Sequence, residues 1–358
     1  ITISSLGGDT SAVQIPLDAT VGDLYQMIAE EHGLRHVQLV AGEKVLNERS
    51  APLPQEQHLQ YMILPKGLYA IGGFWWYPCS CVESFDFLEG SWRANAPMPT
   101  PRAFLATATL NSQIYALGGR DGEHRFLDAI ECFDTFTGTW AASPSLCTAR
   151  AGLAAGVLRG RLCAVGGENP SGVSLNAFEM LDPREGKWQH GPALPTCRRY
   201  LAAATLGDAL YALGGWGSGS AQTKSLRVVE AYDARAGSWT EVAPLNVSRG
   251  NLAAATLDGQ IYVLGGVASD RQGTALNSVE RWLPGASCWE IVSSLPVVNK
   301  DLSAEVLDGE LFAIGGTHGI GRTVMCFDSK TESWRFGARL PTPRYSLGTA
   351  VAPMVRFS

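Results

Sequence analysis

The sequence predicts a mainly β chain of six repeated four-stranded units, preceded by a small α+β domain. Three observations lead to this prediction. An apolar run that ends in Gly-Gly occurs six times, a tryptophan follows each run, and residues 1–66 show neither feature. The composition agrees, because forty Gly and nineteen Pro in 358 residues favour a turn-rich β chain over a helical one.

The N-terminal segment, residues 1–66, has the pattern of a small α+β domain. Thr20 has the character of a helix N-cap, and Leu24 and Ile28 mark the buried side of a helix that we expect to end near Gly33. Alternating apolar and polar residues on both sides of this helix predict strands. The expected elements are strands at 1–6 and 12–17, a helix at 20–33, and strands at 37–41, 45–46 and 58–64.

This order of elements, with Leu-Val-Ala-Gly-Glu-Lys-Val-Leu at 39–46, resembles the ubiquitin-like (β-grasp) domain. The resemblance implies a docking or spacer domain, whose apolar recognition patch would fall near Val40 and Met62. Gly7 and Gly8 stand where the family has a leucine of that patch. Conjugation to other proteins is not expected, because the segment runs directly into the first repeat instead of ending in a free Gly-Gly tail.

The repeated units begin at residue 67 and share three fixed distances. A Glu, or its replacement Met325, precedes each tryptophan by nine residues, and an Arg, or its replacement Asn299, follows each tryptophan after ten. The next Gly-Gly comes sixteen residues later, whereas the distance from each Gly-Gly to the following Glu position varies between 9 and 15 residues. The repeated residues are Gly72, Gly73 and Trp92; Gly118, Gly119 and Trp140; Gly166, Gly167 and Trp188; Gly214, Gly215 and Trp239; Gly265, Gly266 and Trp289; Gly315, Gly316 and Trp334.

Each unit has the pattern of four short strands, which we name a, b, c and d in chain order. In the fourth unit these are residues 198–206, 210–214, 228–233 and 238–242. Glycine-containing turn signals separate the strands in several units. Four short strands roughly every 48 residues favour a β-propeller over a β-sandwich.

The combination of Gly-Gly, Glu-x-aromatic-Asp, Trp and Arg at these distances resembles the kelch repeat over residues 67–352. The resemblance implies a six-bladed propeller. Because the first unit lacks an a strand, we expect residues 344–351 to complete its blade, leaving 353–358 as a tail. The Gly-Gly doublets are expected to permit positive φ at strand ends. The repeated Trp residues are expected to pack between blades, and the repeated Arg residues to donate hydrogen bonds to carbonyls between blades.

The residues expected to bind a partner lie on one face of this propeller. In an antiparallel order a-b-c-d, the b–c loops and the d–a connections emerge on the same side, and only the b–c loops vary in length. In kelch proteins these segments border the partner-binding mouth, and their aromatic and arginine content favours a protein interface. The predicted partner-binding residues are Phe74, Trp75, Trp76, Phe104, Arg120, Glu168, Tyr200, Trp216, Asn251 and Asp301.

The sequence predicts no catalytic, metal or cofactor site. The eight cysteines are scattered without a Cys-x-x-Cys pair, and Cys79 and Cys81 are too close for a usual zinc knuckle, so thiols are expected, with a metal or disulfide role as the alternative. The six histidines form no metal-spaced cluster, and only His318 stands beside a predicted mouth position. An enzyme is therefore a remote alternative, which stays open because some kelch-like propellers are enzymes.

The features favour a non-enzymatic scaffold or assembly subunit that binds one protein through the propeller and a second through the N-terminal domain. The alternative is a kelch-type substrate receptor of a ubiquitin ligase, although no BTB-type or F-box-type segment is present in this sequence. The net charge of −6 disfavours nucleic acid, and no apolar run suggests a membrane span. We expect an intracellular, cytoplasmic protein; because residue 1 is Ile, removal of a targeting segment stays open.

Overall fold

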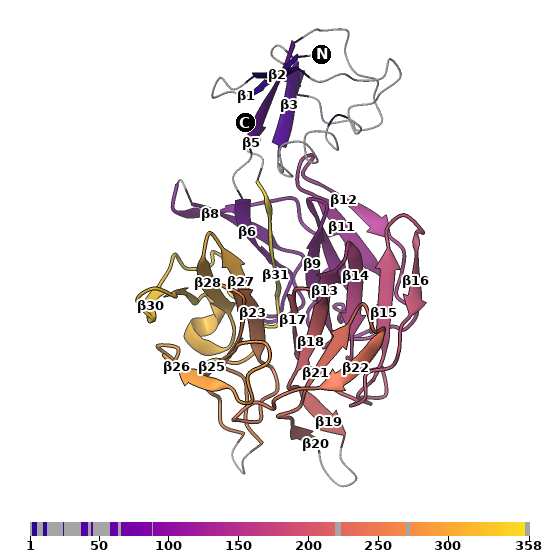
Figure 1. Cartoon of the computed structure of the whole chain (residues 1–358), viewed down its shortest axis with the longest axis vertical. Coiled ribbons are helices and arrows are strands. Elements are labelled where there is room, and N and C mark those ends of the chain that lie inside the picture. Colours follow the sequence, from indigo (N-terminus) through magenta and orange to yellow (C-terminus); the bar gives the residue numbers. More distant parts are fainter. Residues whose placement is uncertain are drawn as a thin grey trace. The chain divides into compact units, whose positions relative to one another are not determined.

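The computed structural model describes residues 66–354, apart from 88, 219–222 and 270–272, together with parts of the segment before them. The described residues of that segment are 2–5, 10–12, 24, 37–41, 44, 45 and 58–63. The chain divides into two compact units, which are described separately (Figure 1). Within the described residues, no helix is long and apolar enough to cross a membrane.

The N-terminal unit contains a five-stranded sheet with the order β2-β1-β5-β3-β4. Its strands are β1 (Thr2–Ser5), β2 (Thr10–Ala12), β3 (Val37–Ala41), β4 (Lys44–Val45) and β5 (His58–Ile63). The first strand runs parallel to the last, and the other neighbours are antiparallel. The second strand begins earlier than the predicted 12–17, because β1 pairs with β2 as Thr2 with Ala12 and Ser4 with Thr10.

The predicted helix at 20–33 lies outside the described residues except for Leu24, which is helical and buried. Membership of the ubiquitin-like family therefore stays a prediction.

The second unit is a six-bladed propeller of four-stranded sheets. From the innermost strand outward, blade 1 contains β31 (Gly348–Pro353), β6 (Lys66–Ile71), β7 (Val82–Asp86) and β8 (Ser91–Ala94), and blade 2 contains β9 (Ala106–Leu110), β10 (Gln113–Leu117), β11 (Ile130–Asp134) and β12 (Thr139–Ser143). Blade 3 contains β13 (Ala154–Leu158), β14 (Arg161–Val165), β15 (Phe178–Asp182) and β16 (Lys187–His190), and blade 4 contains β17 (Ala202–Leu206), β18 (Ala209–Leu213), β21 (Val229–Asp233) and β22 (Ser238–Glu241). Blade 5 contains β23 (Ala253–Leu257), β24 (Gln260–Leu264), β25 (Val279–Trp282) and β26 (Glu290–Val292), and blade 6 contains β27 (Leu302–Leu307), β28 (Glu310–Gly315), β29 (Val324–Asp328) and β30 (Ser333–Phe336). A hairpin of β19 (Trp216–Ser218) and β20 (Thr223–Ser225) and the short helix η1 (His318–Gly321) lie in b–c loops.

Blade 1 is formed by both ends of the repeat region, because β31 lies beside β6. This closing strand runs Gly348–Pro353, whereas the sequence placed it at 344–351. The difference arises because Arg344 to Leu347 belong to the connection that crosses the propeller face, where Tyr345 pairs with Phe74.

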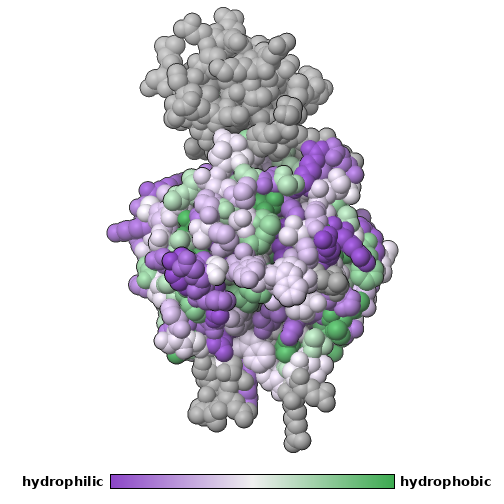
Figure 2. Space-filling view, turned by 180° about the vertical axis from the view of Figure 1, so that it is seen from behind, coloured by the Kyte–Doolittle hydropathy of each residue, from purple (hydrophilic) through white to green (hydrophobic). Residues whose placement is uncertain are grey.

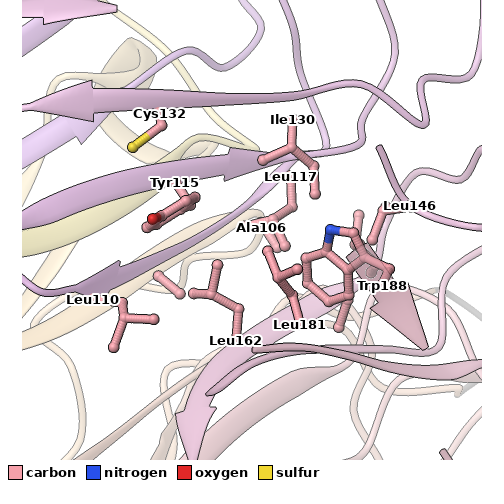
Figure 3. Packing of buried hydrophobic residues seen from close by; sticks show 13 residues of the cluster. Ala106, Leu110, Tyr115, Leu117, Ile130, Cys132, Leu146, Leu162, Leu181 and Trp188 are labelled. Carbon is pink, nitrogen blue, oxygen red and sulfur yellow. The ribbon is translucent and has the colours of Figure 1, made fainter. Parts of the chain in front are cut away.

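Small residues form the six innermost strands, which gather around the middle of the propeller in Figure 1. The larger apolar residues pack between neighbouring blades. In the cluster of Figure 3, Leu117 and Ile130 of blade 2 meet Leu162, Leu181 and Trp188 of blade 3, and all five are buried. Burial of this kind contributes roughly 1.5–3 kcal/mol for each large apolar side chain.

The six repeated tryptophans share one polar contact in addition to their packing. Each indole Nε1–H donates a hydrogen bond of 2.8 or 2.9 Å to a backbone carbonyl 41 to 47 residues earlier in the chain, or, for Trp92, to Ala338 near the C-terminus. The carbonyls belong to the connections that leave the neighbouring blades. Each tryptophan therefore ties the outer strand of its own blade to the preceding blade.

Both glycines of every doublet have positive φ, at the point where strand b ends. At Gly118 a Cβ atom would lie 2.6 Å from the carbonyl oxygen of Arg150, so the close approach of the next connection excludes a side chain as well. The doublet thus allows the connection into each blade to cross directly over the strand end.

A buried arginine occupies the connection into each blade except blade 6. Arg102, Arg150, Arg198, Arg249 and Arg344 are fully buried, and each pairs with the repeated glutamate of its blade at 2.5 to 3.0 Å. The guanidinium groups also donate to backbone carbonyls; Arg198, for example, reaches Gly214 and Val228. The sequence pattern had suggested the carbonyl contacts but not the pairing with glutamate.

Blade 6 departs from this arrangement at both positions. Asn299 replaces the arginine and Met325 replaces the glutamate, and both are fully buried. The Asn299 amide donates to the Gly315 carbonyl at 2.9 Å and so keeps one backbone contact of the arginine. An unpaired buried charge would cost several kcal/mol, and the replacement of both partners together leaves no such charge.

Replacement of one partner in blade 4 is expected to destabilise the propeller more than replacement of both. Arg198→Asn or Glu230→Met alone leaves a buried charge and should lower the free energy of unfolding by about 3–5 kcal/mol. The double variant reproduces the pair in blade 6, so its loss should be smaller than either single loss and far below their sum. Urea unfolding followed by tryptophan fluorescence measures this, because all ten tryptophans lie between positions 75 and 334. Additive losses would contradict the pairing.

Candidate functional site

Six backbone hydrogen bonds form a closed ring at one end of the propeller axis. The residue two positions after each Arg or Asn299 donates its N–H to the carbonyl of the equivalent residue in the preceding blade, at 2.7 to 3.0 Å. The ring residues are Phe104, Gly152, Tyr200, Asn251, Asp301 and Ser346. The last bond, from Phe104 to Ser346, joins the two ends of the repeat region.

All six ring residues have left-handed backbone, with φ between 48° and 59°. Only one of them is glycine, and a Cβ at Gly152 would lie 2.8 Å from the ring of Tyr200. The left-handed conformation costs a residue with a side chain roughly 1–2 kcal/mol. The hydrogen bonds of the ring offset part of this cost, because they satisfy one N–H and one carbonyl at every position.

The residues that directly follow the Gly-Gly doublets form a second tier around this ring. Phe74, Arg120, Glu168, Trp216 and Val267 each form a β-bridge with the residue that precedes a ring residue. In blade 6 the Thr317 N–H donates to the Lys300 carbonyl at 3.0 Å. The b–c loops and the d–a connections therefore meet on one face, which we call the mouth face.

Glu168 is buried in the free chain, and its predicted contact with a partner stays a prediction. Its carboxylate accepts hydrogen bonds from the Tyr200 hydroxyl and from Arg199, both at 2.6 Å, and pairs with Arg120. Burial and this hydrogen bond raise the pKa of Tyr200, which keeps its hydroxyl a donor. The carboxylate holds two arginines in place while they remain 28% and 22% exposed.

A chain of hydrogen bonds fixes the other polar residues of the mouth face. The Trp216 indole donates to Asn251, and the Asn251 amide donates to the Asp301 carboxylate, both at 2.5 Å. Ser346 also donates to Asp301, at 3.3 Å. Burial raises the pKa of Asp301, while these two donors favour its charged form. Trp216, Asn251 and Asp301 are half-buried, and their mutual hydrogen bonds fix the edges that they expose on the mouth face.

Aromatic side chains form the opposite part of the mouth face. Phe74 packs against Tyr345 with ring centroids 5.4 Å apart, and Phe104 packs against Tyr200 at 5.6 Å. The Arg120 guanidinium lies 4.3 Å from the centroid of the Phe126 ring, which sequence reasoning did not single out. Phe126 lies within the b–c loop of blade 2, whose length differs between blades, so the repeat pattern does not identify this residue.

The first b–c loop presents the most exposed aromatic residues of the mouth face. Trp76 and Tyr77 are 75% and 77% exposed, whereas Trp75 is half-buried against Trp76. In the same loop, Cys79 and Cys81 form a disulfide, so the favoured prediction of thiols is wrong for this pair and the disulfide alternative applies. One intervening residue allows their Cα atoms to lie 5.3 Å apart, within disulfide range.

One group in the described part of the propeller has the chemistry of a metal site. The ligand atoms of Cys147, Glu179 and His190 lie within 4.8 Å of one another. The Glu179 carboxylate already pairs with Arg150 and accepts the Cys147 backbone N–H at 2.8 Å. We therefore assign this carboxylate to the buried pairing of blade 3 and place no metal there.

Two substitutions at Ser346 should have opposite effects on stability. Ser346→Gly relieves the left-handed backbone and keeps the ring, so we expect unchanged or slightly raised stability, by up to about 1 kcal/mol. Ser346→Pro cannot adopt positive φ and removes the N–H that donates to Asp301, so we expect a loss of about 3 kcal/mol or more. Urea midpoints from tryptophan fluorescence compare the two. Equal effects would contradict the role of the ring.

Comparison with known proteins agrees with this geometry. The profile of the kelch motif matches residues 101–146, 149–195, 197–246, 248–296 and 300–341, which is more than half of the chain. A curated relative, Kelch-like ECH-associated protein 1B of Danio rerio, is 33% identical over 58 residues, or 16% of this chain. The match spans only 10% of that protein's length.

A solved structure titled "Structure of YjhT" superimposes with a TM-score of 0.62 and 14% identity, covering 72% of this chain and 91% of that one. At this identity the likeness concerns the fold alone. Together with the six Gly-Gly blades and the closed ring at the mouth, the match of the repeat profile shows that the chain belongs to the kelch-repeat family.

Proposed function

We propose that the protein is a non-enzymatic interaction scaffold that binds a protein partner on the mouth face of its propeller. The proposal is supported by one observation: a fixed backbone holds arginine and aromatic side chains that are partly exposed. Arg120 and Arg199 are held by the buried Glu168, and Trp76 and Tyr77 project from the neighbouring loop. Arginine, tryptophan and tyrosine are the residues most often found in the energetic centre of protein interfaces.

The side chains of the mouth face fit a partner that binds and dissociates, because they combine charged Arg120 and Arg199 with aromatic Phe74, Trp76 and Tyr77. Hydrophilic and hydrophobic residues are likewise mixed on the side of the molecule that Figure 2 shows. Non-obligate interfaces have a similar mixture, with aromatic residues and arginine enriched at the centre. Because the ring and the carboxylate fix the mouth face in advance, a partner loses little free energy to ordering it.

A second partner is proposed for the N-terminal unit, as a ubiquitin-like domain. The order β2-β1-β5-β3-β4 with parallel central strands supports this proposal, in addition to the sequence resemblance. A chain that starts at residue 66 should keep the partner of the mouth face and lose the second partner. Retention of all partners by the shortened chain would count against this part of the proposal.

The alternative function, a substrate receptor of a ubiquitin ligase, rests on a weaker observation. The curated relative is a kelch protein named for association with another protein, but the match covers a tenth of it. Co-purification distinguishes the two functions. A cullin subunit would favour the receptor, and a stable complex without one would favour the scaffold.

Substitution of Trp76, Tyr77 or Arg120 should weaken partner binding, and tryptophan fluorescence verifies the fold of each variant because Arg120 also pairs with the buried Glu168. Trp76→Ala combined with Tyr77→Ala, and separately Arg120→Ala, should each cost about 2 kcal/mol or more, which is roughly thirtyfold in Kd. The matched control is Phe336→Ala, because Phe336 is 62% exposed but lies on the outer strand of blade 6. Quantitative capture from the source lysate, followed by titration with the purified partner, measures the loss. Equal loss in the control would place the interface elsewhere.

A further inference from the structure

A cavity of about 570 Å³ lies within the six innermost strands of the propeller. Its lining consists mainly of alanine, glycine, threonine, valine and leucine from these strands, together with the six ring residues. The volume lies in the range of roughly 300–1,000 Å³ that small-molecule sites occupy. The cavity shares its six ring residues with the mouth face, but Trp76, Tyr77 and Arg120 do not line it.

One residue of the lining breaks the pattern of the repeats. The fourth residue after each ring residue is Ala108, Gly156, Ala204, Ala255 or Ala350 in five blades, and Glu305 in blade 6. Five of the six inner strands therefore have no side chain larger than a methyl group here. A glutamate at this position is not required for packing, because alanine fills it in four other blades.

The Glu305 carboxyl lacks a charged partner in the described part of the chain. Burial raises its pKa to about 8, and only the hydrogen bond with the Val306 backbone favours the charged form. In contrast, every repeated glutamate of the blades is paired with an arginine. Glu305 is half-buried at the cavity wall, where a carboxyl without a counter-charge is costly to ionise, and a cation beside it would remove that cost.

The surroundings of Glu305 are acidic or neutral. The described lining contains Asp301 and Glu305 and no Lys, Arg or His, and Asp301 already accepts hydrogen bonds from Asn251 and Ser346. The adjacent inner strands β23 and β31 carry no ionisable side chain in their described residues. On β28 the one ionisable residue, Glu310, binds Arg335 at the exposed end of the strand.

We propose that the axial cavity binds a small organic cation, a protonated amine or a guanidinium compound, with Glu305 as its counter-charge. Alanine and threonine side chains would surround the carbon skeleton, and threonine hydroxyls can accept hydrogen bonds from the cationic group. Near neutral pH, binding moves the Glu305 proton to solvent, so one carboxylate and one cation replace a neutral carboxyl. A metal ion fits less well, because Ca²⁺ requires six to eight oxygen ligands and the cavity offers one free carboxylate.

Calorimetric titration of the full chain tests this proposal, with benzylamine and agmatine as probes and benzyl alcohol as the neutral analogue of the former. We expect at least one cation to bind with one-to-one stoichiometry and with proton release, measured in buffers of different ionisation enthalpy. Affinity should rise as the pH increases from about 6 to about 8, because the carboxyl becomes ionised. Glu305→Gln and Glu305→Ala should each weaken binding at least tenfold, and benzyl alcohol should not bind.

Glu310→Gln is the matched control, because Glu310 lies on the next strand outside the cavity lining. It should bind like the unaltered chain. The alanine variant reproduces the residue of four other blades, and tryptophan fluorescence verifies its fold. The proposal is overturned if neither cation binds, if Glu305→Ala binds as tightly as the unaltered chain, or if Ca²⁺ displaces the amine at equal concentration.

The same carboxyl should also give the free protein a pH-dependent stability. Its pKa is raised from 4.5 in an unfolded chain to about 8, so the native state binds the proton more tightly. The resulting stability is complete below about pH 4.5 and is lost as the pH rises through about 8. Urea midpoints of the unaltered chain should therefore fall relative to those of Glu305→Ala between about pH 5 and about pH 9. Parallel curves would show that Glu305 is not a buried acid.

Discussion

Six backbone hydrogen bonds around the propeller axis determine where the blades meet and what the mouth face presents. Each connection must adopt left-handed φ to direct its N–H at the preceding blade, and it then passes over a Gly-Gly doublet that leaves no room for side chains. The β-bridges of the mouth face and the hydrogen bonds of the buried Glu168 depend on this course of the connections. The ring thus links the closure of the fold to the geometry of the candidate interface.

The buried Arg–Glu pairs hold the connections that lead into the ring. Each arginine lies two residues before a ring residue, so its pairing fixes the point at which the connection enters the ring. Buried pairs contribute little net stability compared with apolar residues, but loss of one partner is costly. Blade 6 agrees with this, because Asn299 and Met325 replace both partners of the pair together. The backbone hydrogen bond of Asp301 in the ring is retained without the pair.

The fold could be predicted from the sequence because its signals are local and repeated. Six doublets and six tryptophans at fixed distances require six equivalent units, and the missing first strand indicates how the ends meet. The ring could not be predicted, because Phe104, Tyr200 and Ser346 give no sign of positive φ, and Gly152, Asn251 and Asp301, which favour it, occupy only half of the positions. Burial of Glu168 also escaped prediction, since its partners Arg120 and Arg199 come from other loops. For residues 13–17 and most of 20–33, the predictions stay untested by the described structure.

Hydrogen exchange at the six ring amides tests the central claim most directly, using mass spectrometry with fragmentation that resolves individual residues. We expect all six N–H groups to be protected and to exchange together only when the whole propeller unfolds; they belong to Phe104, Gly152, Tyr200, Asn251, Asp301 and Ser346. Exchange of any of these amides at the rate of an exposed loop, while the inner strands stay protected, would contradict the account.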